Sequence, residues 1–336
     1  MWAWTGLTLK PAIRVVGGGP AGAAAAIAGL REGRGVDLFE KSVFPRHKVC
    51  GEFISPEAAT LLDELGVLAD FRAAGPARIG RIELHFGRRA KRSRLAEPAF
   101  GLSRYALDAL LIEHAVRLGA RVRREAGAAT PGCVLASGRS AIERPGKRLF
   151  GFKAHFTGPA DDAVELFFFG QCYAGVSVVE HGITNVCALA PEHILRAHGF
   201  DFDSVLRLSE PLAERVRPLT RAMKWLAAGP VAFMDPFSGA GDTTYRAGDA
   251  LGFIDPFTGS GILSALFTGR LAGIAAARGT PAAEHLRECR LRLARQYEVA
   301  KLFRAALRAG WSDYLAFVIP GRVLFYLTRP QASIAR

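Results

Sequence analysis

The apolar and polar positions of the chain form two distinct patterns in its first two hundred residues. Near the start, a β-branched run at residues 13–16 leads through glycines into an alanine-rich segment, and residues 36–39 form a second apolar run. Later, short apolar runs broken by Gly, Pro and Asp occupy residues 149–157, 163–169, 172–179 and 184–189. The first pattern predicts a strand–helix–strand unit of an α/β domain, and the second predicts an antiparallel sheet.

Helical spacing of apolar positions recurs between these regions and dominates the C-terminal part. Ser55 precedes one predicted helix and Ser103 precedes another over residues 104–117, and both serines are candidate N-caps. Further helices are predicted at residues 191–199, 202–216, 262–278, 281–309 and 311–327. The predicted fold is therefore α/β, with a Rossmann-type nucleotide-binding domain, an inserted antiparallel sheet and C-terminal helices.

This pattern divides the chain into three parts, two of which are interrupted. The nucleotide-binding domain is expected at residues 11–78, 101–148 and 231–280. The substrate domain is expected at residues 79–100 and 149–230, and C-terminal helices at residues 281–336.

The first glycines of the chain fit a dinucleotide-binding motif. Gly17, Gly19 and Gly22 match G-x-G-x-x-G at a strand-to-helix junction, with Pro20 and Ala21 inside the motif. Such glycines allow a tight turn, a close approach to a pyrophosphate, and close packing of helix on strand. Glu40, beside Lys41, ends the second strand, where a ribose needs an acceptor. The alternative is a Gly/Ala helix start in an ordinary α/β protein.

A second glycine-rich stretch lies about 230 residues downstream. Gly248 and Asp249 follow a short apolar run, and Gly259, Gly261 and Ile262 begin a long predicted helix. A helix N-terminus attracts anions, and Asp249 is placed to accept hydrogen bonds from a polyol. A capped helix with no ligand is the alternative.

Two other positions have candidate chemistry. Arg104 lies in the first turn of its helix, against the dipole preference, so it is expected to face an anion. Cys50 precedes Gly51 and follows the cations Arg46 and Lys48. Cys50 is therefore either a thiol close to a cofactor or a small buried apolar residue.

Composition restricts the class of protein. The five cysteines are odd in number and form no C-x-x-C pair, which favours reduced thiols and a cytoplasmic location. Residues 1–6 lack the charged start and apolar core of a signal peptide. Pro320 and Arg322 interrupt the most apolar segment, so no membrane span is expected. His193 and His198 fall on different helix faces, and no metal site is expected.

The net charge of +13 points to an anionic partner, with cofactor phosphates as the first candidate. Residues 88–94 carry five basic side chains, expected at a hairpin tip. This run fits a solvated loop, an acyl-carrier protein, a substrate with an anionic tail, or peripheral contact with an anionic membrane. No nucleic-acid recognition motif accompanies the charge, so nucleic acid is disfavoured.

Four stretches together resemble one family. They are the glycine motif at residues 15–22, Lys-Val-Cys-Gly-Glu at 48–52, Ser-Arg-Tyr-Ala-Leu-Asp at 103–108, and the Gly-Asp and Pro-Phe-Thr-Gly-Ser-Gly stretches at 248–262. The set resembles FAD-dependent oxidoreductases of the geranylgeranyl reductase-like branch, within the p-hydroxybenzoate hydroxylase fold.

The resemblance implies a role for each motif. Gly17, Gly19 and Gly22 would hold the FAD pyrophosphate and Glu40 the adenosine ribose. Arg104 and Asp249 would contact the phosphate and ribityl region, the helix start at residues 259–262 would face the flavin, and Cys50 would lie near its ring. NAD(P)H or an external reductase would supply electrons transiently.

The same resemblance implies an apolar substrate that is reduced, or desaturated in reverse, at a C=C bond by hydride transfer. Tyr173, Phe167 and Phe169 are the substrate-pocket candidates. The aromatic Y-x-W-x-F-P signature of the long-chain reductases keeps only Tyr173 here, the W-x-W-x-I-P signature of halogenases is absent, and residues 121–148 are shortened. An FAD-dependent monooxygenase and a flavin-binding protein without catalysis are the alternatives.

Overall fold

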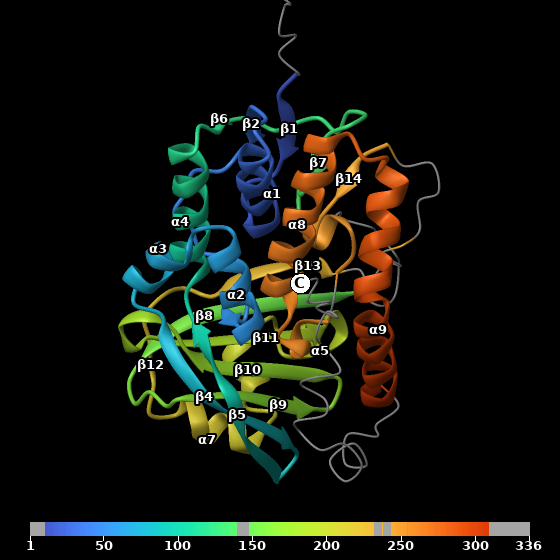
Figure 1. Cartoon of the computed structure of the whole chain (residues 1–336). Helices are drawn as coiled ribbons and strands as arrows, with labels where there is room; N and C mark the ends of the chain where they lie inside the picture. The colour runs from blue at the N-terminus through green and yellow to red at the C-terminus, as the bar shows by residue number, and fades with distance from the viewer. Residues whose placement is uncertain (1–10, 140–147, 232–236, 238–242, 254, 309–336) are drawn as a thin grey trace, which may run out of the picture.

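The structure is a computed structural model that describes residues 11–139, 148–231, 237, 243–253 and 255–308. Within these ranges the strands form two sheets, one above the other in Figure 1. The first sheet is parallel throughout, in the order β14-β7-β1-β2-β6. Its strands are β1 (Ile13–Val16), β2 (Val36–Phe39), β6 (Arg121–Arg123), β7 (Val134–Leu135) and β14 (Tyr245–Arg246).

The second sheet has the order β12-β8-β11-β10-β9-β4-β5-β3, and β13 also pairs with β8. Its strands are β3 (Phe53–Ile54), β4 (Ala77–Phe86), β5 (Arg89–Gly101), β8 (Leu149–Thr157), β9 (Ala163–Phe169), β10 (Cys172–Val178), β11 (Thr184–Pro191), β12 (Thr220–Arg221) and β13 (Leu226–Val231). β4 and β9 are parallel, whereas the other described pairs are antiparallel. The predicted antiparallel sheet is therefore mixed, because the chain leaves the sheet after β5 and re-enters it through β8.

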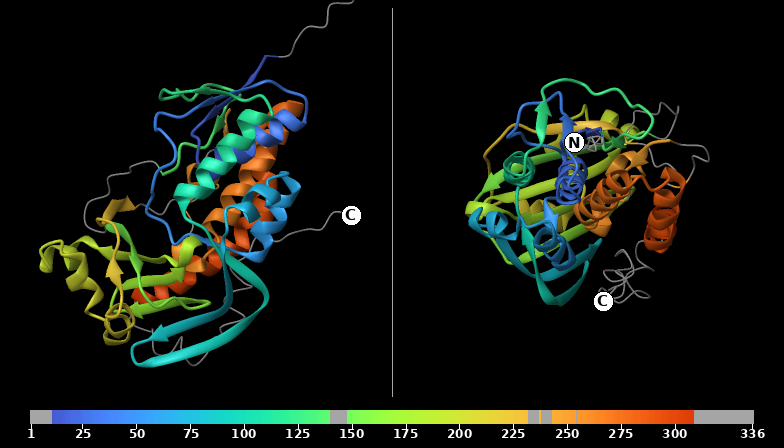
Figure 2. Two further views of the ribbon diagram at one scale, coloured as in Figure 1. Left: turned by 90° about the vertical axis from the view of Figure 1, so that its left-hand side faces the viewer. Right: turned by 45° about the horizontal axis from the view of Figure 1, so that its top comes forward.

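Helices connect and cover the two sheets (Figures 1 and 2). The α-helices are α1 (Pro20–Arg31), α2 (Pro56–Glu64), α3 (Leu68–Ala73), α4 (Arg104–Arg117), α5 (Glu192–Ala197), α6 (Phe202–Leu206), α7 (Glu210–Val216), α8 (Gly261–Arg278) and α9 (Ala282–Arg308). Short 3-10 turns occur at Glu180–Gly182, Gly248–Ala250 and Pro256–Thr258. The predicted fold class, a Rossmann-type α/β domain with an added sheet and C-terminal helices, is confirmed.

Glycines bring α8 against α1, far apart in sequence but side by side in Figure 1. A Cβ atom added at Gly269 would lie 2.1 Å from the backbone oxygen of Ala21, and one at Gly273 would lie 2.2 Å from that of Ala25. Only a residue without a side chain fits at these two positions. The contact fixes the start of α8 beside the start of α1.

Several local predictions change. Residues 202–216 form two helices, α6 and α7, and α3 was not predicted. The basic run at residues 88–94 lies mostly within strand β5 rather than at a hairpin tip. Ser103 caps α4 through a 3.2 Å hydrogen bond from the Ala106 N–H, whereas Ser55 makes no such bond. The predicted helix at residues 311–327 lies outside the described residues.

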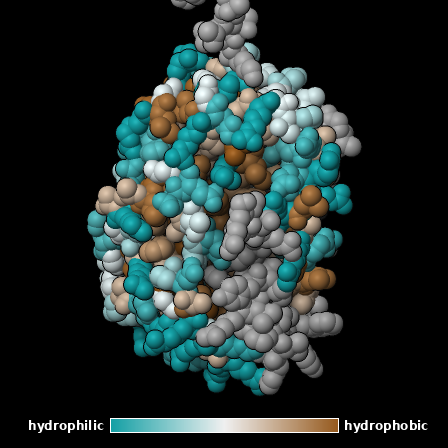
Figure 3. All heavy atoms as spheres, in the orientation of Figure 1, coloured by the Kyte–Doolittle hydropathy of each residue, from teal (hydrophilic) through white to brown (hydrophobic). Residues whose placement is uncertain are grey.

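The core has a separate apolar cluster on each face of the second sheet. One face packs Phe152, Phe156 and Phe167 beneath the α5–α7 segment, and the other packs Phe168 and Phe257 toward α9. On the face of the molecule in Figure 3, hydrophilic residues predominate and hydrophobic ones are scattered. None of the described helices is long and apolar enough to cross a membrane.

Candidate flavin site

A cavity of about 730 Å³ lies where the loops of the first sheet meet the inner face of the second sheet. β1 and β2 end together, since Val16 pairs with Phe39, and both residues line the cavity. In parallel α/β sheets, ligands bind at this carboxyl edge. The cavity size is in the range of cofactor and small-molecule sites.

The first glycine motif forms one wall of this cavity. Gly17 adopts φ 103°, and a Cβ atom there would lie 2.2 Å from the Ala136 backbone oxygen. Gly22 packs on Gly17, because a Cβ atom would lie 1.7 Å from the Gly17 oxygen. Gly17, Gly19, Pro20 and Ala21 line the cavity, while Gly22 supports the turn from behind. The motif thus presents the N-terminus of α1 to the cavity, which favours an anion there.

Glu40 closes the end of β2, and it lines the cavity together with Lys41. Its carboxylate accepts hydrogen bonds from the Gly18 N–H at 2.9 Å and the Ser42 N–H at 2.7 Å. Burial opposes ionisation of Glu40, but these two backbone hydrogen bonds outweigh it and lower its pKa. Glu40 is therefore an ionised acceptor at the rim of the glycine turn.

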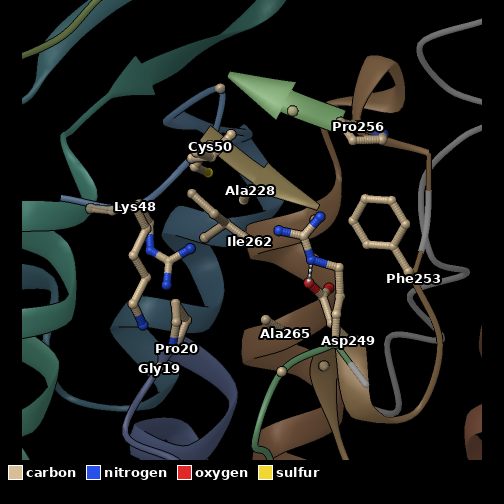
Figure 4. Close-up of a pocket in the computed structure, with 18 of the residues that line it drawn as sticks. Gly19, Pro20, Lys48, Cys50, Ala228, Asp249, Phe253, Pro256, Ile262 and Ala265 are labelled. Carbon is tan, nitrogen blue, oxygen red and sulfur yellow. Dashed lines mark ion pairs between the residues drawn. The ribbon is translucent and has the colours of Figure 1, made fainter. Parts of the chain in front are cut away.

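Two cations lie over the glycine turn. A Cβ atom added at Gly19 would lie 3.7 Å from both Arg104 Nη2 and Lys48 Nζ. Figure 4 shows the Lys48 side chain directed toward Gly19 and Pro20. Both cations share the buried carboxylate of Asp108, which pairs with Arg104 at 2.6 and 2.8 Å and with Lys48 at 3.1 Å.

The three charges hold one another in place. Burial lowers the pKa of Lys48, whereas the Asp108 carboxylate offsets the effect of burial on Arg104 and raises its pKa. Two cations against one carboxylate leave a net positive site over a helix N-terminus. This arrangement suits a diphosphate. The sequence placed Arg104 here but gave Lys48 no ligand role, although its spacing before Cys50 was visible.

The downstream stretch supplies the opposite wall. Gly248, Asp249, Gly259, Gly261 and Ile262 all line the cavity. A Cβ atom on Gly248 would lie 2.8 Å from Ala21 Cβ, so the two stretches are in contact. Figure 4 shows Asp249 and Ile262 on the wall that faces Lys48 and Pro20.

Asp249 has a partner that the sequence did not reveal. Arg139 Nε lies 3.8 Å from Asp249 Oδ2, and the Arg139 guanidinium lies 5.0 Å from the centre of the Phe253 ring. Burial raises the pKa of Asp249, and the charge of Arg139 opposes this rise. Arg139 follows Ser137 and Gly138 in the shortened region, and all three line the cavity.

Cys50 and Gly51 lie in a loop that the second sheet fixes in place. Asn185 Nδ2 donates to the Cys50 carbonyl at 3.1 Å, and Ser177 Oγ donates to the Gly51 carbonyl at 3.4 Å. Cys50 is half-buried and lines the cavity, where Cys187 also contributes. The structure therefore places the Cys50 thiol at the cavity rather than in a core.

The substrate-side predictions separate into two groups. Tyr173 lines the cavity, is buried, and its hydroxyl has no hydrogen-bond partner among the described residues. Phe167 and Phe169 instead pack in the cluster on the outer face of the second sheet. Strand alternation explains the difference, since Phe168 points to the inner face and its two neighbours point away.

Comparison with known proteins agrees with this geometry. Residues 10–130 match the family described as an FAD binding domain. The chain has the FAD-binding fold of flavoenzymes. Menaquinone reductase of Mycobacterium tuberculosis is 47% identical over 53 residues, which is 16% of this chain and 13% of that protein. Conditioned medium factor receptor 1 of Dictyostelium discoideum is 31% identical over 126 residues, 33% of this chain and 24% of that protein. The chain thus spans less than a quarter of these curated relatives.

Solved structures share the fold across nearly the whole chain. The flavin-dependent brominase Bmp2 superimposes with a TM-score of 0.74 at 18% identity, covering 94% of this chain and 92% of that one. A flavoprotein/dehydrogenase from Cytophaga hutchinsonii gives 0.75 at 17%, covering 95% and 91%. The flavin-dependent halogenase CmlS gives 0.74 at 18%, covering 96% and 68%. At these identities the likeness shows the fold alone.

The residues of the cavity fit FAD. Gly19 leaves a cradle beneath two cations, and the glycine turn ends at a helix N-terminus, as a pyrophosphate requires. Glu40 offers an ionised acceptor on one side of this cradle. Asp249 and the start of α8 offer polar groups on the other side. Two separate walls for one long ligand are better suited to FAD than to a smaller nucleotide.

Proposed function

We propose that this protein is an FAD-dependent oxidoreductase that reduces a C=C bond of an apolar substrate, or desaturates it in reverse. The observation that carries this proposal is the polarity of the cavity. Lys48 and Arg104 make one end cationic, whereas the inner face of the second sheet makes the other end apolar. The apolar lining there includes Ile82, Val164, Leu166, Leu189, Phe253 and Phe257.

Bound FAD would supply hydride transfer chemistry. The chain's own residues would bind and orient the reactants. Lys48 and Arg104 would neutralise the diphosphate, and Asp249 would accept hydrogen bonds from hydroxyl groups. The buried Tyr173 hydroxyl, free of partners in the described part of the chain, would donate to a polar atom of an otherwise apolar substrate.

Isoprenoid, polyketide and acyl-type molecules all fit an apolar wall, as the predicted geranylgeranyl reductase-like branch suggests. A menaquinone is the first substrate to test, because the local identity of 47% is to an enzyme named for it. The surplus of basic residues would suit a carrier-bound substrate, an anionic tail or an anionic membrane surface. NAD(P)H or a separate reductase would reduce the flavin, and we place the protein in the cytoplasm.

The alternative function is an FAD-dependent monooxygenase. The named structures that share the fold include a brominase and a halogenase, enzymes of a class that acts through flavin oxidation. A flavin-binding protein without catalysis is a weaker alternative, because Arg139 and Asp249 complete the cavity wall despite the shortened region.

Two measurements separate these functions. The purified chain is incubated with FAD and desalted, and its visible spectrum is recorded before and after reduction with dithionite under argon. We expect bound flavin that is reoxidised by a menaquinone in detergent without oxygen. Product that forms only when oxygen is admitted would favour the monooxygenase, and a flavin that neither acceptor reoxidises would favour the non-catalytic protein.

A further inference from the structure

A fully buried charged cluster lies behind the loop that carries Cys50. Glu52 and Lys153 form an ion pair, and the side chains of both have no exposed surface. His155 Nε2 lies 2.7 Å from the second Glu52 oxygen. Lys153 and His155 share one face of β8 because they are two residues apart in a strand, opposite Phe152 and Ala154 in the core. Burial of such charges is costly, which makes this cluster a candidate for function.

Glu52 also ties the cluster to the cofactor side of the cavity. Its Oε1 accepts the Arg104 N–H at 2.7 Å, and its backbone oxygen accepts the Leu102 N–H at 3.2 Å. Glu52 itself lines the cavity and has a left-handed backbone with φ 55°. Its carboxylate is thus held by three donors at the cavity wall.

His47 connects this cluster to the surface. Its ring meets the His155 ring edge-on at 5.1 Å between centroids, and the Tyr105 ring at 4.9 Å on its other side. Tyr105 is 43% exposed, so this side leads to solvent. One His47 ring nitrogen lies within 4.8 Å of a Glu52 oxygen and a His155 ring nitrogen. Its Nδ1 is buried without a hydrogen-bond partner among the described residues.

His47 is also the histidine that lines the cavity within the described part of the chain. Histidine is the side chain whose ordinary pKa allows proton exchange near neutral pH. The other cavity-lining acids and bases already have assigned partners or lie at the nucleotide end, as Glu40 and Lys48 do. His47 is therefore placed to exchange protons with both the solvent and the cavity contents.

We propose that His47 is the catalytic acid of this site, and that Glu52, Lys153 and His155 position it and set its charge. The inference rests on the proposed function. Hydride from reduced flavin forms a C–H bond at one alkene carbon and leaves an electron pair on the other. That pair takes the proton from an imidazolium N–H of His47, whose N–H bond breaks. The neutral imidazole is then reprotonated from solvent on the side of Tyr105.

The charges around His47 fix the sign of its pH dependence. Burial lowers the pKa of His47, the neighbouring Lys153 and His155 lower it further, and Glu52 and Glu180 oppose them. Because the imidazolium is the reactive form, the rate of the protonation step falls as pH rises through this lowered pKa. Removal of a positive neighbour raises the pKa and extends activity to higher pH.

The same side chains could be considered as metal ligands, since His47, Glu52 and His155 lie close together. However, Lys153 already donates to the Glu52 carboxylate, and its ammonium would repel a dication at that position. A second group of Glu83, His85 and Glu165 is likewise close, but Arg92 and Arg215 pair with its carboxylates. Proton transfer therefore suits the cavity cluster better than metal binding.

The test uses the full chain loaded with FAD. Flavin is reduced with dithionite under argon and mixed with a menaquinone in detergent, and reoxidation is followed over a range of pH. We expect His47→Gln to slow reoxidation by about 100-fold or more, with flavin content unchanged. His193→Gln, an exposed histidine on α5, is the matched control and should leave the rate unchanged.

A second measurement follows the histidine ring signals by NMR in the FAD-loaded chain, which requires no turnover. Lys153→Met should raise the pKa of His47 and move the reoxidation profile to higher pH by the same amount. Lys153→Met leaves Glu52 buried and unpaired, so His155→Gln, which keeps a donor to Glu52, is the second variant and should shift both in the same direction.

The outcomes are distinct. Wild-type protein that does not reoxidise with the quinone contradicts the proposed function. Wild-type protein that does, with an unchanged rate in His47→Gln, overturns the role of His47. A pKa of His47 that does not move in either variant overturns the role of the cluster.

Discussion

The contact between α1 and α8 should control both stability and FAD affinity, and Gly269→Ala tests it. The added Cβ atom would lie 2.1 Å from the Ala21 backbone oxygen and 2.8 Å from its carbonyl carbon. Both are backbone atoms, which cannot turn away, so the helices must separate by about 1 Å to restore contact. Such overpacking costs about 1–3 kcal/mol, whereas Ala in place of Gly within a helix returns about 1 kcal/mol.

The expected result is a loss of about 1–2 kcal/mol in the free energy of unfolding, the difference between these terms. Because Ala21 lines the cavity and touches Gly248, the separation also widens the cofactor site. We expect FAD to bind about tenfold more weakly, which corresponds to about 1.4 kcal/mol. Urea unfolding gives the first quantity, and FAD titration monitored by protein and flavin fluorescence gives the second.

Gly29→Ala is the matched control, since it makes the same change in the interior of α1. Its Cβ atom would lie 2.8 Å from Ile13 Cδ1, the end of a side chain that can rotate. We expect this variant to be as stable as the wild type or slightly more stable. Equal stability and equal FAD affinity for both variants would refute the steric account of the α1–α8 contact.

Three further predictions concern single side chains of the cavity. Lys48→Met should weaken FAD binding about tenfold or more by titration, since a hydrogen bond to a charged group contributes about 1.5–3 kcal/mol, while Asp108 keeps Arg104; unchanged affinity would remove Lys48 from the phosphate site. The pKa of Glu40 is lowered in the folded chain, so its stabilisation is full above the unfolded pKa near 4.5 and is lost as pH falls through the folded value; Glu40→Gln should flatten this part of a urea-unfolding profile, and an identical profile would contradict it. Cys50→Ala should change the rate of flavin reoxidation and leave the unfolding free energy close to wild type, whereas unchanged kinetics would make Cys50 a packing residue.

The local patterns in the sequence predicted most of the elements because their causes are local. The glycine turn, the alanine-rich helix α1 and the alternating strands β8 to β11 depend on backbone freedom, helix propensity and side-chain period. The errors have non-local causes. The parallel pair of β4 and β9 joins strands that are far apart in the chain, and their direction depends on the route between them.

The candidate site was predictable where a motif carried it. The two glycine stretches, Glu40, Arg104, Asp249 and Cys50 were found from spacing, and the structure brings all of them to one cavity. Phe167 and Phe169 were assigned to the pocket from their apolar character, but the register of β9 turns both toward the outer face. Which face of a strand meets the ligand is a property of the sheet rather than of the residue.

The sequence by itself determined that the chain has a dinucleotide-binding α/β domain with a second contact stretch far downstream. Glycine and helix-start chemistry are written in a few adjacent residues and need no tertiary contact to be recognised. Only the tertiary structure decided that Lys48 joins Arg104 over Gly19, that Arg139 faces Asp249, and that Lys153 and His155 are buried against Glu52. Each of these pairings joins separate segments, and the charge of a side chain becomes informative only once burial and a partner are known.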